Sequence, residues 1–255
     1  MRWLQFLALP MVIHTLGISL LAQAPSTPQD ANLLVLRLSP EPLVRDKIPL
    51  TVALREIGLQ VRHGYVLFGV EVRLEESKEP TVSLNLSPAC TLGEALGQVF
   101  RQAPNYEYKI VGPHLIDLYP KGAESNPEHP LNIRVERFDV VNQLPSHLLT
   151  APPLFIPSLM NRLTPPGQPS GTAGSISGQI GEPTVTLHLR SITIREILNA
   201  VAQATEQFPP KYLPLGWVYS FQPDPASPIG GLHSWKPLYS VPPNWKAHNL
   251  GLDNP

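Results

Sequence analysis

One segment of this chain occurs twice. Residues 79–86 read EPTVSLNL and lead into TLGEAL at 91–96, and residues 182–189 read EPTVTLHL and lead into TIREIL at 193–198. A single-residue gap aligns the two copies. Chance rarely reproduces a strand pattern, a loop and a helix start together, so the chain is predicted to contain two copies of one strand-then-helix unit.

Each copy carries the same local signals. Apolar and polar residues alternate along 81–86 and 184–189, which is typical of a strand buried on one face. Thr91 with Glu94, and Thr193 with Glu196, have the spacing of a capping box, which satisfies free amides at a helix start. Apolar residues then recur at helical spacing, which predicts one buried helix face. They are Leu92, Ala95, Leu96, Val99 and Phe100 in the first copy, and Ile194, Ile197, Leu198, Val201 and Ala202 in the second.

The first copy lies within a longer pattern. A short apolar run at 33–38 is consistent with a strand, and helical spacing at 50–61 predicts a helix. Residues 65–74 are typical of a strand. Alternation at 106–110 and 115–119 around Gly112-Pro113 predicts a β-hairpin.

The segments on either side of the second copy give less regular secondary-structure signals. Residues 121–130 form a polar linker, 131–141 predict a strand, and 145–164 are punctuated by prolines and predict one or two short helices. The Gly- and Ser-rich stretch 165–181 predicts a flexible loop. Residues 223–255 are rich in Pro, Gly and Asn and predict an extended tail.

These signals predict an α+β fold of two related β-α-β modules, at 33–121 and 131–222. The helices are expected to pack on one face of small mixed sheets, with proline-rich loops and a proline-rich tail at 223–255. Whether the modules share one sheet or form two domains is left open.

The N-terminus has the pattern of an export signal over residues 1–24. Arg2 precedes the mostly apolar stretch 3–21, and small residues at 22–24 suit cleavage. An uncleaved membrane anchor is the alternative, although Pro10 and His14 disfavour a spanning helix. The predicted location is therefore periplasmic or secreted, with membrane contact only through an uncleaved N-terminal segment.

Composition argues against several classes of function. The formal net charge is −1 with both signs mixed along the chain, so no basic field favours nucleic acid. Cys90 is the only cysteine, which excludes an internal disulfide and a cysteine-based zinc site. The histidines are scattered without metal-ligand spacing. No metal and no cofactor are predicted.

The sequence contains no catalytic signature, and no catalytic residue is predicted. The stretch 174–178 superficially resembles a nucleophile elbow, but its middle position is Ile176 rather than serine. Glu75 and Glu76 are adjacent at a strand end, where their side chains point to opposite faces. The glycine-rich loop 167–181 contains no lysine and leads into a strand, unlike a phosphate-binding loop.

Aromatic residues are the candidate contact surface. Trp217, Tyr219 and Phe221 alternate, so they share one face of a predicted strand, where core packing is the more ordinary explanation. Three further aromatic residues follow in the predicted tail, and they are expected to dock on the protein's own domain or to contact a partner. These residues are Trp235, Tyr239 and Trp245.

The order of helix, two strands, capped helix and closing hairpin resembles the short N-terminal domain shared by secretins and TonB-dependent receptors. The resemblance is strongest over 48–120. There PLTVAL at 49–54 resembles the start of the family's first helix. Residues 81–86 and 91–96 resemble its central strand and second helix. YEYKI at 106–110 and LIDLY at 115–119 resemble its closing hairpin. The second copy resembles this domain only over 183–221. The chain leaves no room for a secretin ring domain or a receptor barrel, so the resemblance implies a small periplasmic module for protein–protein contact.

The expected function is therefore a non-enzymatic interaction module of the bacterial envelope. Its partner is expected to be an envelope protein or a second copy, and free sheet edges are the expected working surface. One alternative is a small-ligand or glycan-binding module that uses the aromatic strand face at 217–221. A second alternative is an unrecognised hydrolase, which a cleft holding a carboxylate and a histidine would support.

Overall fold

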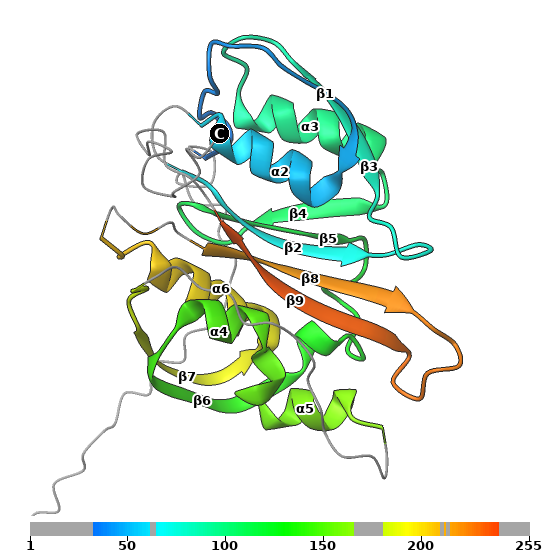
Figure 1. Cartoon of the computed structure of the whole chain (residues 1–255), viewed down its shortest axis with the longest axis vertical. Coiled ribbons are helices and arrows are strands. Elements are labelled where there is room, and N and C mark those ends of the chain that lie inside the picture. The colour runs from blue at the N-terminus through cyan, green and yellow to red at the C-terminus, as the bar shows by residue number, and fades with distance from the viewer. Residues whose placement is uncertain (1–32, 62–64, 166–180, 210–211, 213–214, 240–255) are drawn as a thin grey trace, which may run out of the picture.

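The computed structural model describes residues 33–61, 65–165, 181–209, 212 and 215–239 (Figure 1). The chain folds as the predicted α+β protein, with helices packed on small mixed sheets. The predicted export signal at 1–24, most of the loop 165–181, and the tail beyond residue 239 with Trp245 lie outside the described residues.

The first half contains the elements that its sequence predicts, with one exception. Its repeated strand, capped helix and closing hairpin lie where the periodicity places them. In chain order the elements are β1 (Leu43–Pro49), α2 (Leu50–Leu59), β2 (Leu67–Arg73), β3 (Thr81–Leu86), α3 (Leu92–Gln102), β4 (Tyr106–Ile110) and β5 (Leu115–Pro120).

The exception is the first strand. The run 33–38 forms a helical turn at 33–34 and isolated bridges at Arg37 and Leu38, so a strand there was the wrong expectation. Leu33 and Leu38 are buried, which explains the apolar pattern without a strand. The strand that pairs with β3 is instead β1, whose residues 44–47 are exposed and give no apolar alternation.

The second half repeats much of this order. Pro130–Asn132 form a 3₁₀ turn (η1), and the predicted short helices are present between two strands. The elements are β6 (Arg134–Gln143), α4 (Pro145–Thr150), the 3₁₀ turn η2 (Pro152–Leu154), α5 (Pro157–Leu163), β7 (Val185–Thr193), α6 (Ile194–Thr205), β8 (Leu215–Pro223) and β9 (Gly231–Tyr239).

The strand β9 corrects the prediction of an extended tail from residue 223. It pairs antiparallel with β8 along its whole length, from Leu215 opposite Tyr239 to Pro223 opposite Gly231. Pro237 is tolerated because β9 lies at the edge of its sheet, where a missing amide costs no ladder bond on the open side.

Both halves contribute to one five-stranded sheet in the order β4-β5-β2-β8-β9. The central strand β2 pairs parallel with β5 of its own half and with β8 of the second half. The question that the sequence left open is thereby answered, because the main sheet runs continuously through both repeats.

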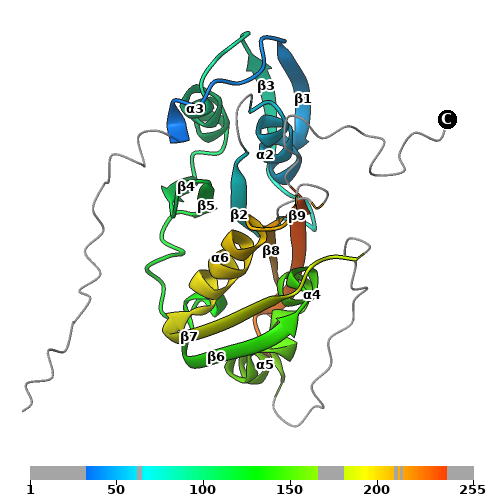
Figure 2. The ribbon, with the colours of Figure 1, turned by 90° about the vertical axis from the view of Figure 1, so that its left-hand side faces the viewer.

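The helices of the two halves lie on opposite faces of this sheet. Figure 2 shows the layers in turn: the β1–β3 ribbon, helices α2 and α3, the five-stranded sheet, helices α6 and α4, and the β6–β7 ribbon. The helices of each half therefore cover one face of the shared sheet, and the capped helices α3 and α6 lie on opposite faces of it.

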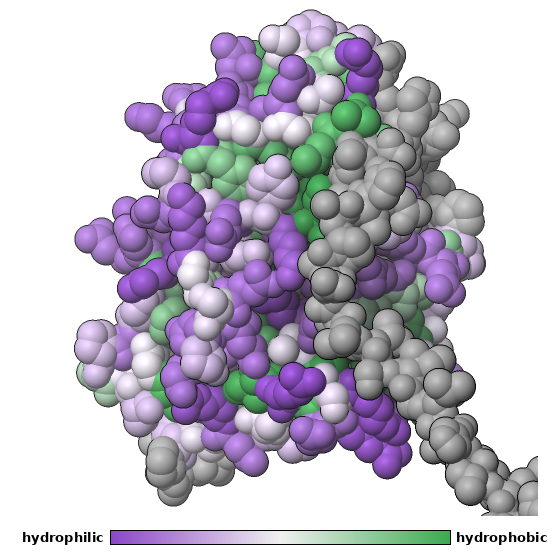
Figure 3. All heavy atoms as spheres, turned by 180° about the vertical axis from the view of Figure 1, so that it is seen from behind, coloured by the Kyte–Doolittle hydropathy of each residue, from purple (hydrophilic) through white to green (hydrophobic). Residues whose placement is uncertain are grey.

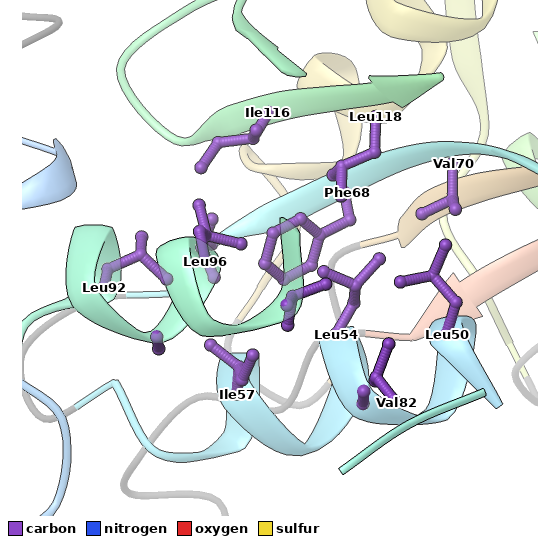
Figure 4. Close-up of a cluster of buried hydrophobic side chains, with 14 of the residues drawn as sticks. Leu50, Leu54, Ile57, Phe68, Val70, Val82, Leu92, Leu96, Ile116 and Leu118 are labelled. Atoms are coloured by element: carbon purple, nitrogen blue, oxygen red, sulfur yellow. The ribbon is translucent and has the colours of Figure 1, made fainter. Parts of the chain in front are cut away.

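Two apolar cores follow from this layering. On one face, side chains from α2 and α3 meet those of the sheet and of β3, as the close-up in Figure 4 shows for Leu54, Phe68, Val82, Leu96 and Ile116. On the other face, the α6 residues Ile197, Leu198 and Val201 pack against the sheet residues Leu115 and Trp217. The repeated helix stripe is therefore used in both cores.

The repeated unit is longer in the structure than the similarity between the two sequence segments indicates. In each ribbon one strand bulges at a residue with positive φ, Lys47 (46°) and Asn142 (52°). The bulged amide donates to a hydroxyl of the repeated strand, from Lys47 N to Ser83 Oγ at 3.1 Å and from Asn142 N to Thr186 Oγ1 at 3.2 Å. The second copy therefore begins near β6 rather than at residue 183.

Contacts at the helix starts also recur in the two halves. The carboxylate of Glu79 accepts the backbone amide of Thr51 at 3.2 Å, and that of Glu182 accepts the amide of Ser146 at 3.0 Å. Each repeated glutamate thus caps the short helix that precedes it in its own half, which explains why the EP pair occurs in both copies.

The predicted capping boxes are confirmed. In α3, Thr91 Oγ1 accepts from the amide of Glu94 at 3.2 Å, and the Glu94 carboxylate accepts from the amide of Thr91 at 2.7 Å. The corresponding distances between Thr193 and Glu196 in α6 are 3.3 and 2.8 Å.

The equivalent leucines Leu96 and Leu198 should contribute similarly to stability, because both are buried in their cores. We expect Leu96→Ala and Leu198→Ala each to lower the free energy of unfolding by about 2–5 kcal/mol. The control Val44→Ala, at a side chain that is 60% exposed, should change it by less than about 0.5 kcal/mol. Urea unfolding checks these values, and a loss below about 1 kcal/mol at either leucine would contradict the assigned helix face.

Candidate functional site

The aromatic strand face predicted as a contact surface lies mostly in the interior. Trp217 and Tyr219 of β8 are both 0% exposed, and Phe221 is half-buried. Trp217 and Tyr219 belong to the core under α6 and α4, so they cannot stack on an external ligand as a flat surface. This corrects their role in the glycan-binding alternative, which required an exposed face.

The aromatic residues of the predicted tail dock on the protein itself. Trp235 and Tyr239 lie on β9 and are half-buried against the second core. The Trp235 ring lies 5.2 Å from that of Tyr219, and the His233 ring lies 4.9 Å from that of Phe221. These contacts make β9 a packed strand, with its aromatic residues directed toward β8.

A buried polar network lies between α6 and the sheet. Arg195 of α6 donates to Glu71 of β2 at 2.7 Å, and the side chain of each is only 5% exposed. His129 approaches the other carboxylate oxygen of Glu71 at 2.8 Å. The Arg195 guanidinium also lies over the Tyr119 ring, 5.0 Å from its centroid. A buried charge is costly unless it is paired, so this pair locks α6 to the first half of the sheet.

The same network includes a second carboxylate. Asn199 of α6 donates to Asp117 Oδ2 at 2.7 Å and accepts from the Trp217 indole at 2.7 Å. Gly69 lies between Asp117 and Trp217 in the sheet, and a Cβ there would be 2.6 Å from the Trp217 ring. Glycine is therefore required where these two side chains meet across β2.

Burial raises the pKa of Asp117 to about 7, because the charged carboxylate is taken out of water. The Asn199 hydrogen bond and the Arg195 charge act against this increase. Asp117 Oδ1 and Arg195 Nε and Nη1 are buried without a hydrogen-bond partner among the described residues. The network is thus incompletely satisfied by the part of the chain that the structure describes, and the protonation of Asp117 is sensitive near neutral pH.

Sequence reasoning missed this network. Its one signal was an isolated charge within an apolar strand pattern, namely Glu71 within 67–72 and Asp117 within 115–119. Such a charge on a buried strand needs a partner. The partners Arg195 and Asn199 lie on a helix more than a hundred positions from Glu71, where no local pattern connects them.

A hollow opens beside the network and has a volume of about 410 Å³. Its walls come from β8, the turn before β9, residues 126–130 and the end of α5. The lining residues are Asn126, Glu128, His129, Pro130, Arg162, Leu163, Tyr219, Phe221, Pro228, Ile229, Gly230 and His233. The hollow therefore brings together a carboxylate and two histidines from distant parts of the chain.

Both histidines of this hollow are occupied by internal partners. His129 Nδ1 accepts the amide of Leu131 at 3.2 Å, so its Nε2 carries the proton directed at Glu71. His233 Nε2 lies 3.4 Å from the Ile229 carbonyl, so Nδ1 accepts the Tyr219 hydroxyl proton at 2.7 Å. Burial lowers the pKa of His233. These partners leave neither imidazole with a free nitrogen for proton transfer.

The sheet edges differ between the two repeats. In β3 the peptide groups of Ser83 and Asn85 face away from β1, and the side chains of two glutamines of α3 form hydrogen bonds with them. Gln102 bonds the amide and carbonyl of Ser83 at 2.9 and 2.7 Å, and Gln98 bonds those of Asn85 at 3.0 and 3.3 Å. The glutamine side chains occupy the positions that a further strand would use, so this edge is closed.

The corresponding edge of β7 is not closed in this way. The register is the same, since Leu84 opposes Arg45 and Leu187 opposes Val140. Thr186 and His188 therefore direct their peptide groups outward. The α6 positions that correspond to the two glutamines are Ala200 and Ala204, and no partner for these outward groups occurs among the described residues.

The described part of the chain contains no group of three or more His, Cys, Asp or Glu residues that could hold a metal ion. Within the same residues, no helix has the length and apolar character needed to cross a membrane. No family model matches this chain, and no curated protein or solved structure matches it. The site must therefore be judged from its own geometry.

The raised pKa of Asp117 predicts a pH dependence of stability. The native state holds this proton up to about pH 7, whereas the unfolded state releases it near the ordinary aspartate pKa of 3.8. Between these values the native state binds more protons, so this group makes stability fall as pH rises, by at most about 1.4 kcal/mol per pH unit.

Urea unfolding of the protein and of Asp117→Asn at pH 5 and pH 8 tests this assignment. The wild-type protein should lose stability relative to the variant as pH rises, because asparagine does not titrate. An unchanged difference between the two proteins at both pH values would refute the assignment.

Proposed function

We propose that this chain is a non-enzymatic protein–protein interaction module of the bacterial envelope, and that an extended segment of an envelope protein pairs with the open edge of β7. The observation that carries this proposal is the contrast between the two equivalent edges, since Gln98 and Gln102 close β3 while Ala200 and Ala204 leave β7 open. An extended segment added there would bond to Thr186 and His188 through backbone groups.

The other edges of the described sheets are less suited to pairing. β1 and β6 are interrupted by bulges at Lys47 and Asn142. β4 is only five residues long and holds Lys109 in an ion pair with Glu124. Helix α4 lies against β9. Bulges and covering elements are among the usual devices that prevent strand addition. Among the described residues, the pairing of β7 with β6 shifts register only where β6 bulges, and no side chain caps the outward peptide groups of Thr186 and His188, which supports a binding role for this edge.

The side chains beside this edge indicate the chemistry of the partner. His188 and Arg190 are exposed on β7, and Arg137 lies opposite Arg190 on β6. All three converge on Asp139, and hydrogen bonds from Arg137 and His188 lower its pKa. One carboxylate therefore faces two guanidinium groups, and the excess positive charge favours a partner strand with acidic side chains at alternate positions.

The face of the molecule seen in Figure 3 is consistent with recognition through backbone and charged groups. On the side opposite to Figure 1, hydrophilic side chains predominate and apolar residues show in separate patches. The resemblance of residues 48–120 to the N-terminal domain of secretins and TonB-dependent receptors also implies protein–protein contact, and the signal pattern at 1–24 is the basis for a periplasmic or secreted location.

The hydrolase alternative is less well supported by the geometry. The hollow does hold Glu128, His129 and His233, but the nitrogens of both histidines are taken by internal partners. Tyr219 supplies the only hydroxyl of the lining, and burial raises its pKa. A nucleophile beside a free general base is therefore lacking in this hollow.

Substitution of His188 separates backbone pairing from side-chain contact. We expect His188→Pro to abolish binding of the captured envelope partner, because proline removes the outward amide while the bonds to β6 are made by its neighbours. His188→Ala keeps that amide and should keep most of the binding. Crosslinking in the native envelope identifies the partner, and titration with the purified partner measures the affinities.

Restoring the missing glutamines is the sharper test. Ala200→Gln with Ala204→Gln should close β7 as Gln98 and Gln102 close β3, and should weaken partner binding at least tenfold with little loss of stability. The matched control, Gln98→Ala with Gln102→Ala, should leave that affinity unchanged. Full binding by the double glutamine variant would refute strand addition at β7, and capture of only a second copy would replace the envelope partner by self-association.

A further inference from the structure

We propose that the hollow beside β8 and β9 is a separate binding site for an uncharged sugar ring. It lies between Phe221 of β8, the 228–230 turn, the 126–130 turn and the end of α5. Its volume of about 410 Å³ falls within the range of small-molecule sites, toward its lower end.

The charges around the hollow are paired within the protein. Arg162 at the rim donates to Glu128 at 2.7 Å, and Arg195 donates to Glu71 behind it at 2.7 Å. Both ring nitrogens of His129 have partners within the protein, as described above. A charged ligand would face no unbalanced charge here, so the site favours a neutral molecule.

The lining of the hollow combines aromatic, aliphatic and polar side chains. The rings of Phe221 and His233 lie 4.9 Å apart and 32° from parallel. Leu163, Pro228 and Ile229 add apolar surface to the lining. Such a surface suits the C–H face of a sugar ring, which is apolar and nearly flat.

The rim supplies hydrogen-bonding groups that have no further partner among the described residues. Arg162 bonds to Glu128 through one of its three guanidinium nitrogens, and Glu128 uses one carboxylate oxygen in return. Asn126 Oδ1 accepts the Glu128 amide, and no bond from Asn126 Nδ2 occurs within the described part of the chain. Donors and an acceptor thus lie beside apolar side chains of the lining, and neighbouring hydroxyls of a sugar can use both kinds of group.

This site differs from the glycan surface expected from the sequence. Trp217 is buried elsewhere in the core, and Tyr219 reaches the hollow while its hydroxyl is bonded to His233. Of the three residues of the predicted aromatic face, Phe221 is the one whose ring is available to contact a ligand. His233 and the 126–130 turn form the rest of the proposed contact surface, in place of Trp217 and Tyr219. The proposal is independent of the β7 edge, which lies on the β6–β7 ribbon.

Titration with chitobiose and with cellobiose, followed by NMR of the His233 imidazole and the Trp235 indole, tests the site. We expect saturable shifts in the millimolar range for at least one disaccharide. Phe221→Leu should weaken that binding roughly tenfold because it removes the ring but keeps the apolar contact. Arg162→Gln should weaken it several-fold. The control Tyr108→Leu alters an exposed ring on the opposite edge strand β4 and should have no effect.

Retained β8 and β9 amide signals establish that each variant is folded. The absence of shifts with both disaccharides would overturn the proposal, as would equal affinities of the wild type, Phe221→Leu and Arg162→Gln. Saturation by a neutral proline-containing peptide in the absence of any sugar response would assign the hollow to a different ligand class and would also overturn it.

Discussion

The parallel pairing of β2 with β8 is the interaction on which the rest of the structure depends. Through it the two repeats build one sheet, with Gly69 to Arg73 opposite Trp217 to Phe221. Neither repeat alone covers both faces of that sheet, because α2 and α3 lie on one side and α6 and α4 on the other. The buried Glu71–Arg195 pair fastens the same junction, since it joins β2 of the first half to α6 of the second.

The two capped helices show how one repeated element has acquired two roles. At equivalent positions α3 carries Gly93 and Gly97 where α6 carries Arg195 and Asn199. The polar pair in α6 reaches the sheet and forms the buried network, whereas Gly93 in α3 allows close approach of Leu34.

At the next pair of equivalent positions the polar side chains are in α3 instead, where Gln98 and Gln102 correspond to alanines in α6. Polar side chains thus close the edge in one repeat and join the layers in the other. The open edge of β7 follows from this exchange, since a helix with alanines at both positions cannot reach the outward peptide groups. The β3 edge can therefore serve as a control for the β7 edge within the same protein. The two ribbons have the same strand register, and they differ in whether glutamines cover the edge.

Local patterns predicted the elements better than their assembly. The capping boxes, the helix stripes and the hairpin around Gly112 follow from spacing within a few residues, and these were found where expected. β1 was missed because it buries few side chains and therefore lacks apolar alternation. β9 alternates between exposed and half-buried residues, but it contains Pro237 and follows a glycine-rich turn, and these features are typical of a tail.

The candidate sites needed contacts that no local pattern contains. The hollow draws residues from 126–130, 162–163 and 219–233, and the contrast between β3 and β7 depends on the register of two ribbons. An alignment of the two repeats shows from the sequence alone that alanines stand where Gln98 and Gln102 stand in the first copy. Only the structure shows that this difference leaves outward peptide groups of β7 uncovered.

Amide hydrogen exchange of the isolated protein tests the central claim most directly, because it compares equivalent peptide groups of the two repeats in one experiment. The amides of Ser83 and Asn85 should exchange slowly, since Gln102 and Gln98 hold them. Those of Thr186 and His188 should exchange rapidly and become protected when the partner binds. Equal protection of the two pairs in the free protein would contradict the account, because the β7 edge would then already be closed.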